Sequence, residues 1–466
     1  MSTDPVPSSS GTVRVVNPAT ELPVAEVARQ DAADADAAVG RARRAFPAWR
    51  DVAPGDRTRL LRRFAEQVEQ HAEELALLET RNVGKPIADS RGEVSMVADV
   101  LHFYSGAVEK HRGATIPVAR GVDLTWHEPL GVVAAIVPWN FPLAIASWKI
   151  APALACGNTV VVKPAELTPL TALRLAELAL EAGLPEGVLQ VVVGRGTTVG
   201  TCLVEHPDVA KVAFTGSTEA GRDVMARAAG TIKRVTLELG GKSANIVFAD
   251  ADLELAAASA PFAVFGNAGQ DCCARSRILV EHVAFDRFVE LLVAATQALV
   301  VGDPEDPATQ MGPLVSAEHR ARVAGYVDPD AGALPVVGRS GVPGGPGWWF
   351  PATVLAPVES EHRVWREEIF GPVVAVTPFR DEAHAVELAN DTPYGLSGSI
   401  WTRDSSRALR MAKAVQAGVL SVNSNTSVRV NAPFGGMKQS GFGRELGMEA
   451  LASFSDVKNV FLSTED

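Results

Sequence analysis

Short runs of β-branched and apolar residues, separated by stretches with helical spacing, fill the chain between residues 131 and 239. Each run is apolar on both faces, which is typical of strands in a parallel sheet that helices cover on two sides. Such a sheet usually binds a nucleotide at the carboxyl ends of its strands. The pattern therefore predicts an α/β domain of Rossmann type, with strands in GVVAAIV, NTVVVKP, VLQVVV, VAKVAF and RVTLEL.

The 466 residues are too many for one compact core, so the length predicts two or three domains. Residues 31–80 show helical spacing with interruptions at Pro47 and at Pro54-Gly55, which favours two or three amphipathic helices. A second α/β stretch follows residue 240. Its strands are expected near residues 244–248, 277–280 and 373–378.

Two further segments favour a small β element. The segment GATIPVARGVDLTWHEP is typical of a hairpin, and the tail FSDVKNVFLS of one more strand. Both could form edges that another subunit completes. The expected division is a cofactor domain at 1–112 and 130–239, a second α/β domain at 240–438, and an oligomerisation element at 113–129 and 439–466.

Composition excludes several classes of protein. The net charge is -12 and the chain has no Lys/Arg-rich run, so nucleic acid is not expected as a partner. The sequence holds no apolar window long enough to span a bilayer, and the first ten residues lack the regions of a signal peptide. We therefore expect a cytoplasmic protein with a frayed N-terminus. The four cysteines are too few and too oddly spaced for a disulfide framework or a thiolate metal site.

Glycine clusters give weak phosphate-binding signals. GRGTTVG (194–200) has one residue too many for a dinucleotide fingerprint, GSTEAG (216–221) lacks the Lys-Ser/Thr of a P-loop, and GGKS (240–243) lacks the preceding glycine. Each is more often a turn glycine than a binding loop. The first two nevertheless follow an expected strand and open an expected helix, where free N–H groups favour a pyrophosphate.

Two charged residues follow the strand in VVVKPAELTP. Lys163 and Glu166 stand where the ribose of a nucleotide could lie. A carboxylate accepts hydrogen bonds from two ribose hydroxyls and would repel a 2′-phosphate, so Glu166 favours NAD over NADP. The alternative is an acid that caps the helix expected after Thr168.

Three residues are candidates for chemistry. Cys272 lies in a polar loop, NAGQDCCARSR, whereas Cys156 and Cys202 lie in helical apolar patterns, although a buried inert cysteine is the commoner case. Asn140 of PWNFP could donate to a developing oxyanion or only form a turn. Glu238 of ELGGKS could be a general base or a solvated acid at the end of a strand.

Taken in order, PWNFP, KPAE, FTGST, ELGGK, GQDC, EIFGPV and PFGGMKQSGFGRE make the chain resemble the aldehyde dehydrogenase superfamily over residues 14–464. The resemblance implies a subunit with a cofactor domain, a catalytic domain and a β oligomerisation element, assembled into dimers or tetramers. It implies oxidation of an aldehyde to a carboxylic acid with NAD, through a thiohemiacetal and a thioester. Acyl transfer to coenzyme A is the main variant, and an acid at position 238 favours hydrolysis instead.

The resemblance also implies residue roles. Cys272 would be the nucleophile, Asn140 and the backbone N–H of Cys272 the oxyanion donors, and Glu238 the base that activates water. Glu368 would hold the nicotinamide ribose, and no metal is implied. The other cofactor residues would be Trp139, Lys163, Glu166, Gly216, Ser217, Gly221, Leu239 and Phe370.

The substrate is less constrained. Asp271 lies beside the candidate nucleophile. An acid at this position resembles the aminoaldehyde and betaine-aldehyde branches of the family, and it favours a substrate with a cationic tail. Arg429 would favour an anionic tail, as in a semialdehyde, if it faced the pocket, and a broad-specificity enzyme is a further alternative. Alternatives from other classes are a cofactor-independent esterase and a binding protein without activity. The expected pocket comprises Phe141, Trp148, Asp271, Cys273, Val428 and Phe434.

Overall fold

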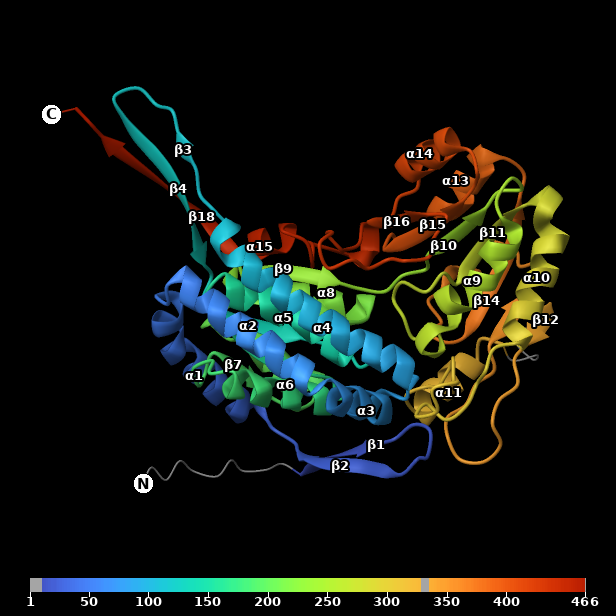
Figure 1. Cartoon of the computed structure of the whole chain (residues 1–466), viewed down its shortest axis with the longest axis horizontal. Helices are drawn as coiled ribbons and strands as arrows, with labels where there is room; N and C mark the ends of the chain where they lie inside the picture. Colours follow the sequence, from blue (N-terminus) through green and yellow to red (C-terminus); the bar gives the residue numbers. More distant parts are fainter. Residues whose placement is uncertain (1–10, 328–334, 466) are drawn as a thin grey trace.

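The computed structural model describes residues 11–327 and 335–465, so the expected fraying of the first ten residues lies outside the described part. Figure 1 shows two α/β lobes side by side, with a narrow β arm projecting from the first lobe near the C-terminus. A hairpin of β1 (Thr12–Val16) and β2 (Pro23–Ala28) runs along the opposite side of that lobe. No helix among the described residues is both long and apolar enough to cross a membrane.

The first lobe is built on a six-stranded sheet in the order β17-β9-β8-β5-β6-β7, parallel except for β17 at one edge. Alternate residues of β5 point to opposite faces, and all five are buried, as expected for a strand covered on both sides. All five predicted strands are confirmed, and β17 was not predicted. The strands are β5 (Val132–Ile136), β6 (Thr159–Lys163), β7 (Leu189–Val191), β8 (Val209–Thr215), β9 (Arg234–Glu238) and β17 (Gly441–Phe442).

Helices cover both faces of this sheet (Figure 1). The predicted break at Pro47 is wrong, because α1 continues through it to Arg50, whereas Pro54 does begin α2. A proline inside a helix costs one hydrogen bond, and the buried face of α1, from Ala35 to Trp49, offsets that loss. The helices are α1 (Ala32–Arg50), α2 (Pro54–Gln70), α3 (Ala72–Val83), α4 (Ile87–Ala107), α5 (Pro142–Ala155), α6 (Leu170–Glu181), α7 (Thr201–Glu205) and α8 (Thr218–Ala228).

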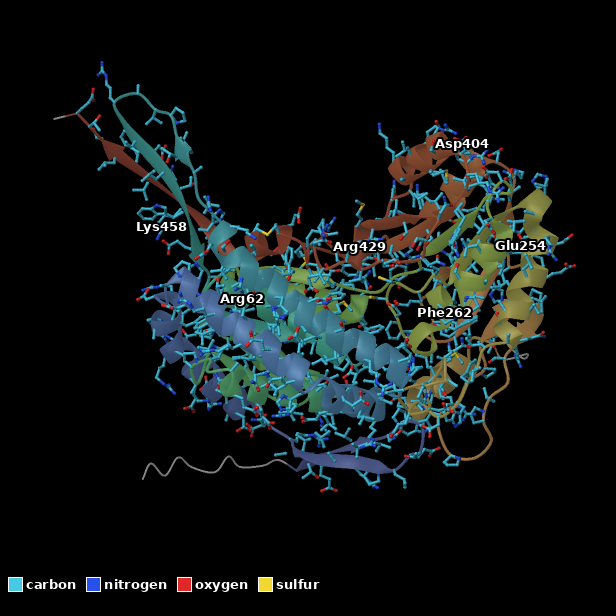
Figure 2. The ribbon with its side chains drawn as sticks, in the orientation of Figure 1. Arg62, Glu254, Phe262, Asp404, Arg429 and Lys458 are labelled. Atoms are coloured by element: carbon cyan, nitrogen blue, oxygen red, sulfur yellow. The ribbon has the colours of Figure 1, made fainter. Side chains whose placement is uncertain are left out.

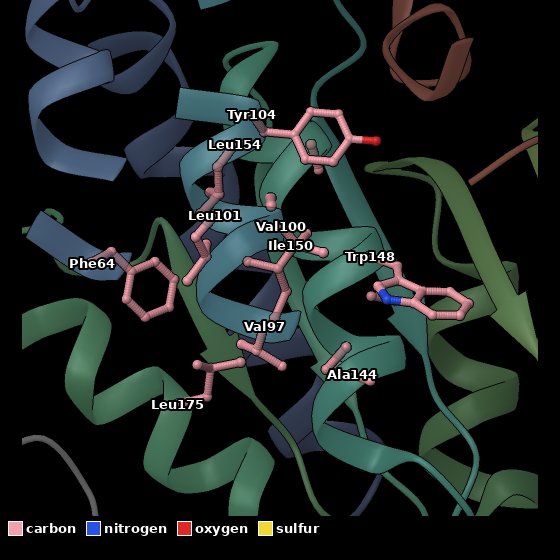
Figure 3. Packing of buried hydrophobic residues seen from close by; sticks show 14 of the residues in the cluster. Phe64, Val97, Val100, Leu101, Tyr104, Ala144, Trp148, Ile150, Leu154 and Leu175 are labelled. Carbon is pink, nitrogen blue, oxygen red and sulfur yellow. The ribbon is translucent and has the colours of Figure 1, made fainter. Parts of the chain in front are cut away.

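Helix α5 is buried along its whole length, which matters because it begins directly after Asn140 and Phe141. Figure 3 shows the side chains of α4 and α5 interleaving, with Trp148 at the edge of this packing. A side chain of α4 holds the first turn of α5 in place. The backbone N–H of Ala144 in α5 donates to the carboxylate of Glu93 in α4 at 2.9 Å. The loop before α5 is therefore anchored in the core.

The second lobe holds a seven-stranded sheet in the order β12-β13-β14-β11-β10-β15-β16, in which only β12 is antiparallel. The three predicted strands are confirmed as β10, β11 and β14, and four were missed. The strands are β10 (Ala244–Val247), β11 (Arg277–Glu281), β12 (Val336–Arg339), β13 (Thr353–Leu355), β14 (Val373–Phe379), β15 (Ser397–Trp401) and β16 (Val419–Val422). The helices are α9 (Leu253–Phe265), α10 (Phe285–Gln297), α11 (Ala317–Ala324), α12 (Arg363–Arg366), α13 (Glu382–Asn390) and α14 (Ser405–Ala414).

The arm is a three-stranded antiparallel sheet of β3 (Thr115–Ile116), β4 (Gly121–Pro129) and β18 (Ser455–Ser463). Both the expected hairpin and the expected C-terminal strand are present. Residues 441–454 lie elsewhere than the sequence suggested: β17 extends the six-stranded sheet, and α15 (Glu449–Ser453) packs against α5. Their apolar side chains fill the core of the first lobe, so the arm receives only the residues from Ser455 onward. The division into three domains remains a prediction.

Candidate active site

Two cavities meet at Cys272. The first, which we call the cleft, has a volume of about 190 Å³ and is lined by loops from both lobes. It brings together eight of the predicted site residues. These are Trp139, Asn140, Gly216, Ser217, Leu239, Cys272, Glu368 and Phe370.

The second cavity, which we call the side cavity, has a volume of about 290 Å³. All six predicted pocket residues line it, namely Phe141, Trp148, Asp271, Cys273, Val428 and Phe434. Its remaining walls are largely apolar, with Met96, Ala144 and Ile145 among them. Only Cys272 and Ile145 line both cavities, so the sulfur-bearing residue stands at their junction.

The loop that carries Cys272 follows α9 and is sharply bent. Asn267 and Ala268 both have positive φ, at 49° and 55°, and Ala274 closes a turn by donating to the carbonyl of Asp271. The backbone of Cys272 packs so closely on Gly241 that a Cβ at Gly241 would collide with the Cys272 carbonyl. This contact explains why the second glycine of the ELGGK motif, Gly241, cannot carry a side chain.

The environment of the Cys272 thiol favours its protonated form. Its hydrogen bond with Cys273 and its burial raise its pKa well above the ordinary value, and the nearby acids Asp271 and Glu368 raise it further. The two sulfurs and a carboxylate oxygen of Asp271 lie within 4.8 Å of one another. A thiol in such surroundings needs its proton removed when it attacks.

Asn140 is 2% exposed and bridges the two lobes. Its side-chain Nδ2 donates to the carbonyl of Gln270 at 2.9 Å, and its own carbonyl accepts from Asn267 Nδ2 at 2.9 Å. An amide nitrogen carries two hydrogens. Since the described residues supply one acceptor for Nδ2, one N–H remains for a ligand in the cleft.

Glu238 ends β9 but lines neither cavity. Within the described chain, neither of its carboxylate oxygens has a hydrogen-bond partner, and Oε1 lies 2.8 Å from the position that a Cβ on Gly435 would take. Burial and the neighbouring carboxylate of Glu445 raise its pKa well above the ordinary value, and Cys273 adds to this effect. Glu238 therefore lies outside the lining of both cavities, close enough to Cys273 to interact with it electrostatically.

A buried ion pair near Glu238 was missed by sequence reasoning. Lys149 of α5 pairs with Glu445 and donates to Thr215 Oγ1 at 2.7 Å. The signal was present, because Lys149 is the one charged residue in the apolar helix PLAIASWKIAPALA, and Glu445 ends the motif GFGRE. A lone charge in a buried helix requires a partner.

The start of α8 lines part of the cleft. Ser217 is the N-cap of α8, with its Oγ accepting from Ala220 N at 3.2 Å, so the first backbone N–H groups of the helix open near Gly216 and Ser217. Gly221 allows Leu239 to pack on α8, since a Cβ there would come within 2.5 Å of Leu239 Cδ2. GSTEAG thus has the geometry that its sequence suggested.

The opposite end of the cleft combines an acid with aromatic rings. Glu368 Oε1 accepts from the backbone N–H of Gly241 at 2.8 Å, and burial raises the pKa of Glu368 to about 7. Trp139 and Phe370 meet edge to face with centroids 5.2 Å apart. The sequence missed His319, whose Nε2 lies 2.7 Å from the carbonyl oxygen of Phe370.

Lys163 is the last residue of β6 and Glu166 lies in the loop that follows, and both are outside the cleft lining. Burial lowers the pKa of Lys163 to about 8, and its Nζ donates to the carbonyl of Pro164 at 2.9 Å. Glu166 accepts from Arg29 Nε at 2.8 Å. The GRGTTVG segment forms a π-helical turn (Gly196–Gly200), and its Gly194 packs on the carbonyl of Gln30.

The remaining specificity candidate, Arg429, is exposed and lines neither cavity (Figure 2). Arg275 lines the side cavity, but its guanidinium donors are bonded to side chains and carbonyls of the protein. They reach Ser399 at 2.9 Å, Ser397 at 2.6 Å and Ser427 at 2.7 Å. No described arginine therefore offers a partner to an anionic tail in the side cavity.

A cysteine at the junction of the cleft and a largely apolar side cavity, with an amide donor nearby, is typical of enzymes that use a cysteine nucleophile. Comparison with known proteins specifies the family. The model of the aldehyde dehydrogenase family matches residues 6–460, and the chain belongs to that family.

The chain is similar to three characterised types of aldehyde dehydrogenase. It is 45% identical to phenylacetaldehyde dehydrogenase of Pseudomonas fluorescens over 98% of this chain and 93% of the relative. It is 43% identical to the NADP/NAD-dependent aldehyde dehydrogenase PuuC of Escherichia coli, over 97% and 93%. It is 41% identical to betaine aldehyde dehydrogenase of Bacillus subtilis, over 97% and 94%.

Solved structures agree in fold. The crystal structure of PnpE in complex with nicotinamide adenine dinucleotide matches with a TM-score of 0.96 and 43% identity, covering 98% of this chain and 96% of PnpE. The α/β architecture of the resemblance, with two parallel-sheet lobes, is thereby confirmed.

Proposed function

We propose that this protein oxidises aldehydes to carboxylic acids with NAD, through a thioester on Cys272. The observation that carries the proposal is the position of Cys272, which lines both the cleft and the side cavity. An aldehyde entering through the side cavity would meet the sulfur at the point where a cofactor in the cleft ends. The cytoplasmic location stays a prediction from the sequence.

The cleft fits a dinucleotide by its donor set. The N-terminus of α8 at Ser217 offers backbone N–H groups for a pyrophosphate, Glu368 offers a carboxylate for ribose hydroxyls, and Trp139, Leu239 and Phe370 offer apolar surface for a ring. Bound there, NAD would accept a hydride from the carbon that is attached to sulfur. Lys163 and Glu166 would hold the adenosine ribose. If the charge of Glu166 is considered alone, NADP is the less expected cofactor, because a carboxylate repels a 2′-phosphate.

Cys272 adds to the aldehyde carbon, and Asn140 stabilises the resulting oxyanion. The remaining Nδ2–H of Asn140 and the backbone N–H of Cys272 are the two donors, because neither has a partner that the described residues supply. One such donor is typically worth about 3 to 4 kcal/mol in the transition state. Because the thiol pKa is raised, addition must be accompanied by loss of the thiol proton.

Glu238 activates the water that hydrolyses the thioester. Its carboxylate lies outside the lining of both cavities, so we propose that the side chain rotates toward Cys272 for this step. Rotation breaks no hydrogen bond to any described residue, because neither carboxylate oxygen has a partner among them. The pair of Lys149 and Glu445 holds the neighbouring wall in place.

The side cavity favours an aldehyde with a cationic tail, such as an aminoaldehyde. Asp271 is the one carboxylate in its lining, and Trp148 and Phe434 present ring surfaces, with centroids 5.2 Å apart, that attract cations. An anionic semialdehyde is disfavoured, because Arg429 lies outside the cavity and Arg275 is bonded within the fold. The apolar walls favour a neutral arylacetaldehyde as the second candidate.

An aldehyde panel tests this proposal. We would measure kcat/KM with NAD for aminoaldehydes, trimethylammonio-aldehydes, arylacetaldehydes, aliphatic aldehydes and semialdehydes, in the wild type and in Asp271→Asn. The substitution should lower kcat/KM for cationic substrates about tenfold relative to neutral ones, since it removes one charge contact. Arg429→Gln is the matched control and should leave the ranking unchanged. An equal effect of Asp271→Asn on all substrates would assign the carboxylate a structural role.

Formation of NADH, followed by its absorbance, separates an aldehyde dehydrogenase from the alternatives in other classes, and Cys272→Ser tests the nucleophile. Loss of a nucleophile should reduce turnover by more than about 1,000-fold. An esterase would release acid from activated esters without NAD at a rate that the cofactor does not change. A binding protein would show neither activity.

We further propose that the arm joins subunits into a dimer or tetramer. Its strands expose large apolar side chains, including Trp126 at 47%, Phe461 at 54% and Val457 at 64%. Apolar surface gathered on a thin sheet is typical of an interface.

A further inference from the structure

Arg29 is fixed at the edge of the sheet where the adenosine ribose is expected. It directly follows β2, and the next residue, Gln30, is bound on both sides to the segment after β7. The Gln30 N–H donates to the Val193 carbonyl at 2.8 Å, and the Val193 N–H donates to Gln30 Oε1 at 2.8 Å. Gly194 permits this approach, since a Cβ there would come within 2.5 Å of the Gln30 carbonyl oxygen. The guanidinium therefore reaches the loop after β6 from an anchored backbone.

Two cations, Arg29 and Lys163, and one carboxylate, Glu166, therefore lie at the carboxyl end of β6. Arg29 Nε donates to Glu166 Oε1 at 2.8 Å, across 137 residues of sequence. Their side chains are 29% and 26% exposed, so a ligand can reach the pair. Lys163 ends β6, three residues before Glu166, and its Cδ lies 3.6 Å from the position of a Cβ on Gly200.

The pairing of Glu166 with Arg29 reverses the expectation, drawn from Glu166 alone, that the site excludes NADP. A lone carboxylate accepts ribose hydroxyls and repels a 2′-phosphate. A carboxylate that is already paired with a guanidinium repels it less, and a phosphate dianion is a stronger partner for the guanidinium than a carboxylate is. Phosphate can therefore displace Glu166 from Arg29.

We propose that Arg29 sets the coenzyme selectivity of this enzyme, by exchanging Glu166 for the 2′-phosphate of NADP, so that the protein uses both NAD and NADP. The inference rests on the proposed function in one respect, that the cofactor's adenosine ribose lies at Lys163 and Glu166. In NAD the hydroxyls of the ribose face Glu166, and in NADP the 2′-phosphate faces Arg29.

Steady-state kinetics with both coenzymes test the proposal. We would compare the wild type, Arg29→Gln and Arg29→Lys at a fixed saturating aldehyde. Arg29→Gln should lower kcat/KM for NADP about 10- to 100-fold more than that for NAD, the size of one lost charge-assisted hydrogen bond. Arg29→Lys should retain part of the NADP activity, because it keeps the charge. Glu166→Gln should raise the NADP/NAD ratio. Arg43→Gln removes another arginine–carboxylate pair of the same lobe and should change neither coenzyme.

A binding assay separates this inference from the reaction. Calorimetric titration with 2′,5′-ADP and with 5′-ADP measures the contribution of the 2′-phosphate without any aldehyde. Wild type should bind 2′,5′-ADP at least as tightly as 5′-ADP, and Arg29→Gln should lose that preference. Equal weakening of both nucleotides by Arg29→Gln, or a wild type that neither binds 2′,5′-ADP nor turns over with NADP, would overturn the proposal. Absence of turnover with either coenzyme, alongside Arg29-dependent binding of 2′,5′-ADP, would refute the proposed function and support the nucleotide site.

Discussion

Asn140→Ala isolates the contribution of the amide donor to catalysis. The substitution removes the hydrogen bond from Nδ2 to the Gln270 carbonyl, but that carbonyl still accepts from Asn267 at 3.3 Å. The bond that Asn267 donates to residue 140 reaches a backbone carbonyl and survives the change. The free energy of unfolding should therefore fall by only about 1 to 2 kcal/mol, the value of one buried hydrogen bond and its cavity.

The effect on the reaction should be much larger. Loss of one oxyanion donor removes about 3 to 4 kcal/mol of transition-state stabilisation, which corresponds to about 100- to 1,000-fold in kcat. Stopped-flow detection of NADH should show both the burst rate and the steady-state rate falling, because the donor acts before hydride transfer. Thermal unfolding of the same sample measures the structural cost.

Asn267→Gly is the matched control. Asn267 has φ 49°, which glycine adopts without strain, and it lines neither cavity. The control loses two hydrogen bonds in the same network while the donor of Asn140 remains, so its kcat should fall less than about tenfold. The reasoning would be refuted by a kcat of Asn140→Ala within fivefold of wild type, or by equal losses in the two variants.

Three other outcomes are expected. Glu238→Gln should keep the burst of NADH and slow steady-state turnover at least tenfold, because hydrolysis of the thioester follows hydride transfer; loss of the burst would give Glu238 an earlier role. Burial raises the pKa of Glu368 from 4.5 to about 7. Between these pH values the native protein keeps the proton of this carboxyl group and the unfolded protein loses it. The free energy of unfolding should therefore fall by up to about 3 kcal/mol as the pH rises from 4.5 to 7. Glu368→Gln should remove that decline, seen as a higher Tm relative to wild type at pH 8 than at pH 5. Phe461→Glu should yield smaller species by light scattering, and an unchanged mass would exclude the exposed ring from the interface.

The sequence predicted those elements whose signal is local. Strands such as β5 and β6 are continuous apolar runs, and a parallel sheet follows from them directly. Strand β15 was missed because it reads SGSIW, and its buried Ser397 and Ser399 are satisfied by Arg275, a residue far away in the sequence. Polar residues that are buried through a distant partner give no periodic signal.

The site shows the same limit. Motifs gave Asn140, Cys272 and Glu368, and the structure brings all three into one cleft. Arg29 could not be found this way, since its pairing with Glu166 depends on how the β1–β2 hairpin folds across the edge of the sheet. The position of Glu238, outside the cleft lining, also depends on packing that no motif records.

The arrangement of donor and nucleophile depends on contact between the lobes. Asn140 belongs to the first lobe and Cys272 to the second, and the bond from Asn140 Nδ2 to the Gln270 carbonyl joins the two. Gln270 is held in turn by its side chain, whose oxygen accepts from Val315 N at 2.9 Å. A small change in how the lobes meet would move the donor relative to the sulfur while each core stayed intact. Misplacement of a catalytic group by about 1 Å can cost 100-fold in rate, so turnover should be more sensitive than stability to substitutions along this seam.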